Sequence, residues 1–459
     1  MPAADAARRY LVLKFGGSSV DGGEKIGGVA DLVARRPEPR LVVVSAMGKV
    51  TSELQRLAAQ AAQGDVEAAQ RGLAELVDRH LQAVTQATGS SNGPGWVREA
   101  IAEEADRVAD ELERLVHLPG AAAGEVSPQQ NDAVVSLGEL LSSRIVAAAL
   151  VARGVDAEWC DPRDLVATDD GFGGARPDRA RIFREVQQRV VPLLDAGKVV
   201  VTGGYVGRAP GGETTTMGRE SSDLSATLIG GALRAEAVEI WTDVDGILTA
   251  DPRLVQGARL IPALSYREAA WLARLGAKVI HPDTVAPAAA AGAAVRIRNR
   301  FRPEAPGSVI GPAPAGLALW GIAAREVLLS GTNGKVVKAR FPAEGSWALA
   351  TGYRLGSVPL QLRVAQSVLE HVGKTARVLV SIVGRIRGLD GTLEAEVRHA
   401  LRDLDAVAVP GRGVAISQLL PLGEAREAVE RLHRVAFERD PAPVPAAEAT
   451  PTAETPATC

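Results

Sequence analysis

Short, continuous apolar runs alternate with helical patterns between residues 10 and 310, and this alternation constrains the fold most strongly. The clearest runs are LVLKF, LVVV at 41–44, KVVVT at 198–202 and VEIWT at 238–242. Such runs are typical of strands that are buried on both faces, and helices between them favour parallel pairing. We therefore predict a three-layer αβα domain with a mainly parallel sheet.

The first apolar run ends in a motif with the composition of an anion-binding loop. Lys14 closes the run, and Phe15, paired glycines and paired serines follow (KFGGSS). Gly16 and Gly17 lack a Cβ atom, so their backbone amides can approach a phosphate closely. We expect the serines to cap the next helix, whose N-terminus adds positive potential. The alternative is a plain strand–turn–helix junction with a surface lysine.

The second run, 41–44, leads into the segment SAMGKVT, which carries Ser45 and Thr51. Ligands of open α/β sheets bind beyond the carboxyl ends of the strands, so this loop is a candidate wall of the same site. An ordinary Gly/Ser turn is the alternative. Glu139 lies in the apolar helical pattern 134–150. Because an unpaired buried ion is costly, its partner is either Arg144 or the ammonium group of a substrate.

A long polar loop at 203–223 carries Arg219, Ser222 and Asp223 immediately before an apolar helical pattern. Polar loops of this length are uncommon inside a compact domain unless they have a function. Together with Lys14 they supply cations, hydroxyls and a carboxylate. These groups are suited to holding a nucleoside triphosphate during phosphoryl transfer.

The loop after VEIWT carries Asp243, Asp245, Asp251 and Arg253, and Lys278 lies at the end of the following helical pattern. Three aspartates suggest calcium binding, but the glutamate that closes an EF-hand is missing and the flanks are strand-like. The pattern therefore favours nucleotide contacts. If the acceptor is a carboxylate, it needs no general base, because it is already ionised at pH 7.

Composition excludes several classes of function. The net charge is -3, so no basic excess is available to attract nucleic acid. With only two cysteines, Cys160 and Cys459, neither a disulfide framework nor a cysteine metal site is expected. The N-terminus has no apolar signal core, and charges interrupt the alanine-rich runs. We expect a cytoplasmic protein without membrane contact.

The pattern changes beyond Pro312. Residues 318–437 read as strands and helices of a smaller α+β module, and residues 438–459 form a low-complexity segment that we predict to be a disordered tail.

Taken in order, seven segments resemble the aspartate kinases of the amino-acid kinase family. They are KFGGSS, SAMGKVT, SLGELLS, DDGFG, TTTMGRESSD, WTDVDGILTADPR and LGAKVIHP. The resemblance covers about residues 9–310, which it identifies as the catalytic domain. It implies ATP-dependent phosphorylation of the L-aspartate β-carboxylate to 4-phospho-L-aspartate, the first step towards lysine, threonine and methionine. ATP is the phosphoryl donor, and the resemblance implies Mg²⁺ held mainly by the nucleotide phosphates, without a protein metal site.

The resemblance also implies roles for individual residues. The catalytic residues that it implies are Lys14, Asp223 and Lys278. The ATP-binding residues that it implies are Lys14, Gly16, Gly17, Ser18, Ser45, Thr242, Asp243, Arg253 and Lys278. The substrate-binding residues that it implies are Thr51, Glu139, Phe172, Arg219, Ser222 and Asp223, with Glu139 near the ammonium and Phe172 as an aromatic wall.

Members of this family usually carry two ACT modules that bind lysine or threonine. Residues 378–437 resemble the second module, whereas the first is degenerate, because GKVVKARF reads as a strand where a helix is expected. The resemblance therefore predicts a homodimer formed through the ACT-like region, and we hypothesise weak or absent feedback inhibition. Two alternatives are a family kinase acting on a different small acceptor, such as glutamate, a carbamate or a nucleoside monophosphate, and a non-catalytic ACT-type regulatory subunit.

Overall fold

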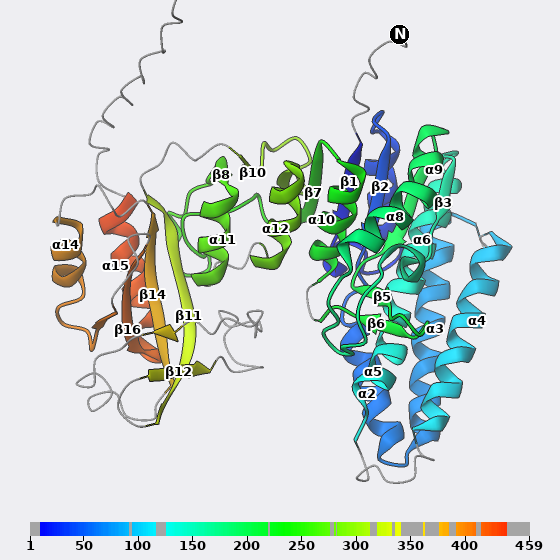
Figure 1. Ribbon diagram of the computed structural model, residues 1–459, viewed down its shortest axis with the longest axis horizontal. Helices are drawn as coiled ribbons and strands as arrows, with labels where there is room; N and C mark the ends of the chain where they lie inside the picture. Colours follow the sequence, from blue (N-terminus) through cyan, green and yellow to red (C-terminus); the bar gives the residue numbers. More distant parts are fainter. Residues whose placement is uncertain are drawn as a thin grey trace, which may run out of the picture.

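The protein is described here from a computed structural model of the full chain. The structure describes residues 10–90, 94–115, 125–218, 221–275, 280, 282–312, 319–332, 336–340, 361–362, 376–384, 392–409 and 415–437. Two bodies lie side by side in Figure 1, a larger one built on described residues up to about 312 and a smaller one built on strands nearer the C-terminal end.

The larger body is built on an eight-stranded sheet with the strand order β3-β4-β2-β1-β7-β9-β10-β8. Every neighbouring pair is parallel except β9 and β10, which are antiparallel. The prediction of a mainly parallel sheet is therefore confirmed. The strands are β1 (Leu11–Phe15), β2 (Arg40–Val44), β3 (Ala157–Trp159), β4 (Val199–Gly203), β7 (Ala237–Thr242), β8 (Ala263–Ser265), β9 (Ala294–Asn299) and β10 (Ser308–Gly311).

Helices cover both faces of this sheet, as a three-layer fold requires. The core on one face includes residues of α1 (Gly23–Ala34), α2 (Val50–Ala62), α3 (Val66–Thr88), α4 (Gly95–Arg114), α5 (Pro128–Val135) and α6 (Leu137–Val151). The opposite face packs against α8 (Arg179–Arg189), α9 (Val191–Asp195), α10 (Ser222–Leu233), α11 (Tyr266–Leu275) and α12 (Pro282–Ala291). The short helix α7 (Pro162–Leu165) and the hairpin β5 (Val206–Arg208) and β6 (Thr214–Thr216) complete this body.

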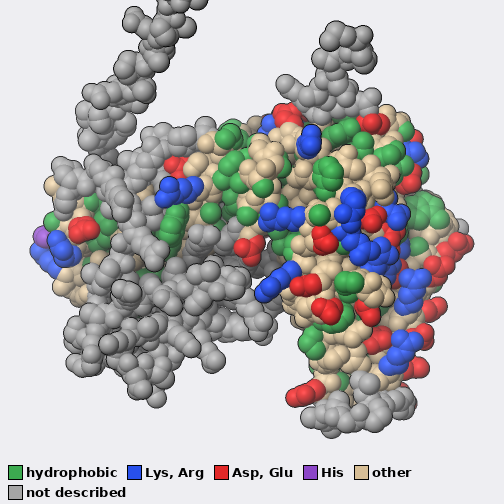
Figure 2. Space-filling view, viewed as in Figure 1, with side chains coloured by type: hydrophobic (Ala, Val, Ile, Leu, Met, Phe, Trp, Pro, Cys, Tyr) green, Lys and Arg blue, Asp and Glu red, His purple; other side chains and the backbone are tan. Residues whose placement is uncertain are grey.

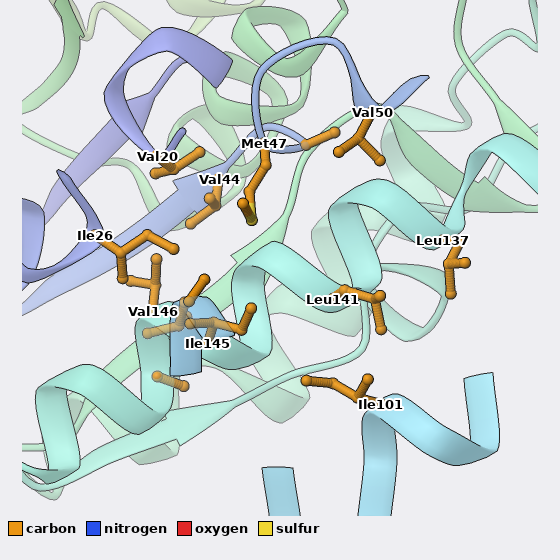
Figure 3. Close-up of a cluster of buried hydrophobic side chains, with 14 of the residues drawn as sticks. Val20, Ile26, Val44, Met47, Val50, Ile101, Leu137, Leu141, Ile145 and Val146 are labelled. Atoms are coloured by element: carbon orange, nitrogen blue, oxygen red, sulfur yellow. The ribbon is translucent and has the colours of Figure 1, made fainter. Parts of the chain in front are cut away.

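Side chains of β1 alternate between the two faces, and this alternation places the predicted catalytic lysine. Phe15 and Leu13 belong to the core that contains α1 and α6, whereas Val12 packs with α8 and α10. Lys14 is two residues after Val12, so it lies on the α10 side of the sheet. Figure 3 shows part of the opposite core, where Ile26 of α1 and Val146 of α6 lie close together.

Helices α5 and α6 follow one another with little interruption. By length and composition, the helix at residues 128–151 could cross a membrane, because an 18-residue window within it has a mean hydropathy of 1.7, but 94% of that window is buried inside the protein. Burial of this kind is what a core helix requires. The segment is therefore explained by packing within the larger body.

The smaller body contains a six-stranded sheet with the order β13-β12-β11-β14-β16-β15, in which every described pairing is antiparallel. Its strands are β11 (Leu319–Thr332), β12 (Val336–Arg340), β13 (Gln361–Leu362), β14 (Ala376–Gly384), β15 (Val407–Val409) and β16 (Ala415–Pro421), with helices α14 (Thr392–Ala400) and α15 (Ala425–Phe437). Residues 336–340 form a strand, as GKVVKARF predicts. The predicted tail lies outside the described residues.

The two bodies meet at the loop that follows β7. The Thr249 carbonyl accepts a hydrogen bond from Ile322 N–H of β11 at 2.7 Å, and its Oγ1 lies 3.0 Å from Nε2 of His433 in α15. Ala250 and Val255 join the hydrophobic core of the smaller body. The loop is thus anchored on residues that come much later in the chain.

Charges of both signs are interspersed on the face of the larger body seen in Figure 2. Such a mixture agrees with the small net charge and differs from the concentrated basic surface of a nucleic-acid-binding protein.

His80 of α3 provides a test of the packing. Its side chain is fully buried, Nδ1 lies 2.7 Å from the Leu76 carbonyl oxygen, and burial lowers the pKa of His80 from 6.5 to about 4. The unfolded chain therefore binds the proton more readily. Above pH 6.5 His80 is neutral in both the folded and the unfolded protein. As the pH falls from 6.5 towards 4, only the unfolded chain takes up the proton, so the free energy of unfolding falls by about 3 kcal/mol in total.

We therefore predict that the thermal midpoint falls between about pH 7.5 and about pH 5, and falls less in His80→Leu. His399→Gln, at an exposed histidine, is the control. Equal pH dependence in the wild type and His80→Leu would contradict the buried neutral state.

Candidate active site

The centre of the candidate site is an ion pair at the carboxyl end of β1. Lys14 Nζ lies 2.6 Å from Oδ1 of Asp223, in the first turn of α10. Lys14 is only 9% exposed, so the pair is largely shielded from water. Two residues that are 209 positions apart in the sequence are thus brought together, as the sequence predicts for a site built from separate loops.

The predicted cradle follows Lys14 directly. Gly17 begins a short 3-10 turn (Gly17–Ser19), and a Cβ atom on Gly17 would lie 2.8 Å from the carbonyl oxygen of Ala46. A side chain at Gly17 would therefore push the β1 loop away from the β2 loop. Gly16 lies beside the Lys14 ammonium, since a Cβ there would be 3.6 Å from Nζ. Ser18 is exposed to solvent.

The expectation that the paired serines cap the next helix is wrong. Helix α1 begins only at Gly23, its N-cap residue is Gly22, and no side chain caps it. The 3-10 turn separates the serines from the helix, and Gly22 enters the helix with a φ of 100°, a conformation that favours glycine. Gly16, Gly17 and Ser18 therefore form a turn at the strand end and not a helix N-terminus.

The loop after β2 lies next to this turn. The Ser45 N–H donates to the Phe15 carbonyl at 3.0 Å, and the Ser45 carbonyl accepts from Ser142 Oγ of α6 at 2.8 Å. Thr51 is the second residue of α2 and is partly exposed, so its side chain lies at a helix N-terminus. Free backbone N–H groups at such a position attract anions.

Glu139 is a buried carboxyl group in the first turn of α6. It is 4% exposed, and its Oε2 has no hydrogen-bond partner. Burial raises the pKa of Glu139 to about 8, against the opposing effects of the Ala46 backbone and the positive charge of Lys14. A cation placed beside Oε2 would restore the ionised form. The group is therefore chemically suited to receive an ammonium.

The alternative partner for Glu139 is not used. Arg144 instead pairs with Glu104 of α4 at 3.0 Å, and its guanidinium lies 3.6 Å from the centre of the Trp159 ring. Arg163 also pairs with Glu104 at 2.9 Å. These contacts join α4, α6 and α7, so Arg144 belongs to a structural ion network.

The loop that carries Phe172 is closed by its own hydrogen bonds. Asp169 Oδ1 accepts from the N–H groups of Gly171 and Arg176, and Phe172 N–H donates to the Asp170 carbonyl. Phe172 is partly exposed. Ser222, which the sequence assigns to substrate binding, is buried at the start of α10, beside Asp223.

The loop after β7 carries the predicted nucleotide contacts. Thr242 Oγ1 donates to Asp243 at 3.1 Å, and both residues lie at the carboxyl end of β7, next to β1. Arg253 is mostly exposed and forms a two-pronged pair with Asp251. Asp245 accepts from Asn299 Nδ2 at 2.7 Å and also pairs with Arg302.

These pairs disfavour calcium binding, because Asp245 and Asp251 already have partners. Within the described ranges, no group of three or more His, Cys, Asp or Glu side chains could hold a metal ion. Arg219 and Lys278, two of the predicted site residues, lie outside the described residues.

Comparisons with known proteins agree with this geometry. The sequence pattern of the amino acid kinase family matches residues 9–299. The chain belongs to the amino acid kinase family.

Within this family, the chain is similar to aspartokinases. It is 37% identical over 303 residues to lysine-sensitive aspartokinase 3 of Escherichia coli, covering 65% of this chain and 64% of that protein. It is 36% identical over 308 residues to the chloroplastic aspartokinase 1 of Arabidopsis thaliana, covering 65% and 51%. The matched segments therefore span less than two thirds of these relatives.

The similarity extends further in three dimensions. The crystal structure of E. coli aspartokinase III with aspartate and ADP (R-state) matches with a TM-score of 0.75 at 27% identity, covering 94% of this chain and all of that one. The T-state structure of the same enzyme with lysine and aspartate matches with a TM-score of 0.70 at 26% identity, covering 93% and 99%.

The sequence interpretation missed one buried carboxylate, which holds the loop that carries Phe172. Asp132 of α5 is fully buried and accepts hydrogen bonds from Gly173 N–H at 2.8 Å, Thr216 N–H at 2.8 Å and Thr216 Oγ1 at 2.6 Å. The one local signal was its position, because Asp132 lies just before the apolar pattern 134–150 and precedes Glu139 by seven residues, or two helical turns.

A glycine directly after β4, Gly204, lets the chain approach the start of α10, beside the ion pair. A Cβ atom on Gly204 would lie 2.6 Å from Cβ and 2.8 Å from Cα of Ser222, the residue before Asp223. We predict that Gly204→Ala lowers the free energy of unfolding by about 1–3 kcal/mol, because α10 must shift. Calorimetry or urea unfolding measures this change.

Gly28→Ala is the matched control, since Gly28 is exposed in α1 and nothing lies within 4 Å of its Cβ position. It should leave stability unchanged or raise it by up to about 1 kcal/mol. Equal effects of the two substitutions would argue against a tight β4–α10 contact.

Proposed function

We propose that this protein is an aspartate kinase, which transfers the γ-phosphoryl group of ATP to the β-carboxylate of L-aspartate and releases 4-phospho-L-aspartate and ADP. The observation that carries the proposal is the shielded Lys14–Asp223 pair beside the buried Glu139, in an amino acid kinase that is similar to aspartokinases along its catalytic segments. The solved structure that it resembles, E. coli aspartokinase III, contains aspartate and ADP.

The chemistry requires little covalent participation by the protein. The acceptor carboxylate is already ionised at neutral pH, so the main barrier is repulsion between it and the phosphate oxygens. Lys14 supplies a positive charge at this point, and Asp223 fixes its position. A cation held in place before the reaction stabilises the developing charge without reorganising in the transition state.

Mg²⁺ is expected with the nucleotide. The resemblance to aspartate kinases implies that the oxygens of the triphosphate are its main ligands, and Mg²⁺ would neutralise part of their charge. Asp223 is paired with Lys14.

Glu139 supports an amino acid as the acceptor. Its carboxyl group is buried, its pKa is raised to about 8, and its Oε2 has no hydrogen-bond partner. The ammonium of aspartate would supply the missing partner. The β-carboxylate would then extend towards Lys14, whose positive charge acts to lower the pKa of Glu139.

We further propose residues 9–310 as the catalytic domain, residues 318–437 as an ACT-like region that supports a homodimer, and a cytoplasmic location. The hypothesis of weak feedback inhibition belongs to the same proposal. The lysine sensitivity named for the E. coli relative makes it testable by direct comparison.

An acceptor panel tests the activity. With ATP, Mg²⁺ and hydroxylamine, L-aspartate should form the hydroxamate at least about tenfold faster than L-glutamate, because an extra methylene shifts the reacting carboxylate. Parallel reactions offer a carbamate or a nucleoside monophosphate in place of the amino acid, and so test the other acceptors of the family. No ATP turnover with any acceptor would favour a non-catalytic subunit, and addition of lysine or threonine tests feedback.

The role of Glu139 gives a pH prediction. An ammonium needs the ionised carboxylate, so the KM for aspartate should fall as the pH rises through about 8. Glu139→Gln should raise the KM for aspartate at least about tenfold, because a charge-assisted hydrogen bond is lost, and should remove this pH dependence.

The KM for ATP serves as the internal control and should change little. Glu104→Gln provides a second control, since it removes a buried carboxylate that contacts arginines outside the site. An unchanged KM for aspartate in Glu139→Gln would show that the ammonium binds elsewhere.

A further inference from the structure

We propose that Asp132 is a positioning residue that holds the Phe172 loop and strand β6 together as one wall of the substrate site. The inference rests on the proposed function, because the resemblance to aspartate kinases implies that Phe172 is an aromatic wall beside the substrate. Asp132 itself lies in α5 and is fully buried. It acts through the backbone of its partners.

The two carboxylate oxygens of Asp132 accept different hydrogen bonds. Oδ2 accepts both backbone N–H groups, from Gly173 and Thr216, each at 2.8 Å, whereas Oδ1 accepts the Thr216 hydroxyl at 2.6 Å. Gly173 directly follows Phe172 and has a φ of 77°, a left-handed conformation that suits glycine. The carboxylate thus fixes the peptide group that determines where the Phe172 loop turns.

The same two segments are joined at a second point. The Thr216 carbonyl accepts a hydrogen bond from Ala175 N–H at 2.9 Å, so the loop also bonds Thr216 directly, while the Thr216 N–H and hydroxyl bond to Asp132. Thr215 Oγ1 also lies 2.7 Å from Thr168 Oγ1, just before the loop. These bonds connect the segments to each other, and Asp132 connects both of them to α5.

The Asp132 carboxylate is stabilised by its hydrogen bonds, despite its burial. The structure describes only neutral donors on Asp132, and burying an ion among neutral groups is unfavourable unless its bonds are good. Three short hydrogen bonds from fixed donors meet that condition. Because α5 leads directly into α6, Asp132 and Glu139 lie two turns apart on one helical segment, so the loop wall and the ammonium site share one support.

The prediction separates positioning from folding. Asp132→Ala should raise the KM for aspartate about tenfold or more while the KM for ATP changes less than about twofold, because only the substrate wall loses its anchor. Asp132→Asn should retain most of the affinity, since its amide can accept the two N–H bonds and donate to the Thr216 hydroxyl. Thr216→Val, which keeps the side-chain shape, should have an intermediate effect.

Hydrogen–deuterium exchange of the full-length protein supplies a readout that does not depend on activity. Exchange should become faster within residues 169–176 in Asp132→Ala, and should not change there in Asp65→Ala, which removes a distant helix cap. If Asp132→Ala does not fold, the KM values and the exchange rates are both measured on Thr216→Val instead.

The outcomes are distinct. A folded Asp132→Ala protein with unchanged KM for aspartate, or with KM values for aspartate and ATP that rise equally, overturns the positioning role. If the wild type does not phosphorylate aspartate, the proposed function fails. In that case faster exchange at 169–176 supports the anchor on its own, and unchanged exchange overturns it.

Discussion

The arrangement of the site depends on one ion pair, between Lys14 and Asp223. Removing an ammonium and a carboxylate from water is costly, and close contact between them offsets that cost only if their geometry is well defined. The geometry here comes from the order of the sheet. Strand β1 lies between β2 and β7, so its carboxyl end is central, and α10 begins directly opposite. Gly204 lets β4 and α10 approach closely enough to keep the pair together.

The helical segment formed by α5 and α6 provides the second constraint. Most of its buried side chains are apolar, yet it also carries the buried carboxyl groups Asp132 and Glu139. Asp132 has three donors, whereas Glu139 keeps a free oxygen and a raised pKa. The protein itself satisfies the first carboxyl group, and we propose that a substrate ammonium pairs with the second. This difference separates a supporting role from a binding role in the same helix.

Much of this could be predicted from the sequence, because the physical signals are local. Continuous apolar runs mark the central strands β1, β2, β4 and β7, and the family motifs point to Lys14 and Asp223. The helix cap at the serines was wrong because a 3-10 turn intervenes, and no periodicity signals such a turn. The partner of Glu139 was left open because the choice depends on Arg144, which turns towards Glu104 and Trp159. Asp132 was missed because its partners, two backbone N–H groups and the Thr216 hydroxyl, lie 41 and 84 residues away in the sequence.

The most direct test of the account is a double-mutant cycle on the Lys14–Asp223 pair, with kcat for aspartyl hydroxamate formation as the measured quantity and circular dichroism to confirm folding. If Asp223 acts by positioning Lys14, then Lys14→Met should lower kcat by about a hundredfold or more, and Lys14→Met combined with Asp223→Asn should be no slower. A Lys14→Met protein that is folded and retains the wild-type kcat would contradict the account.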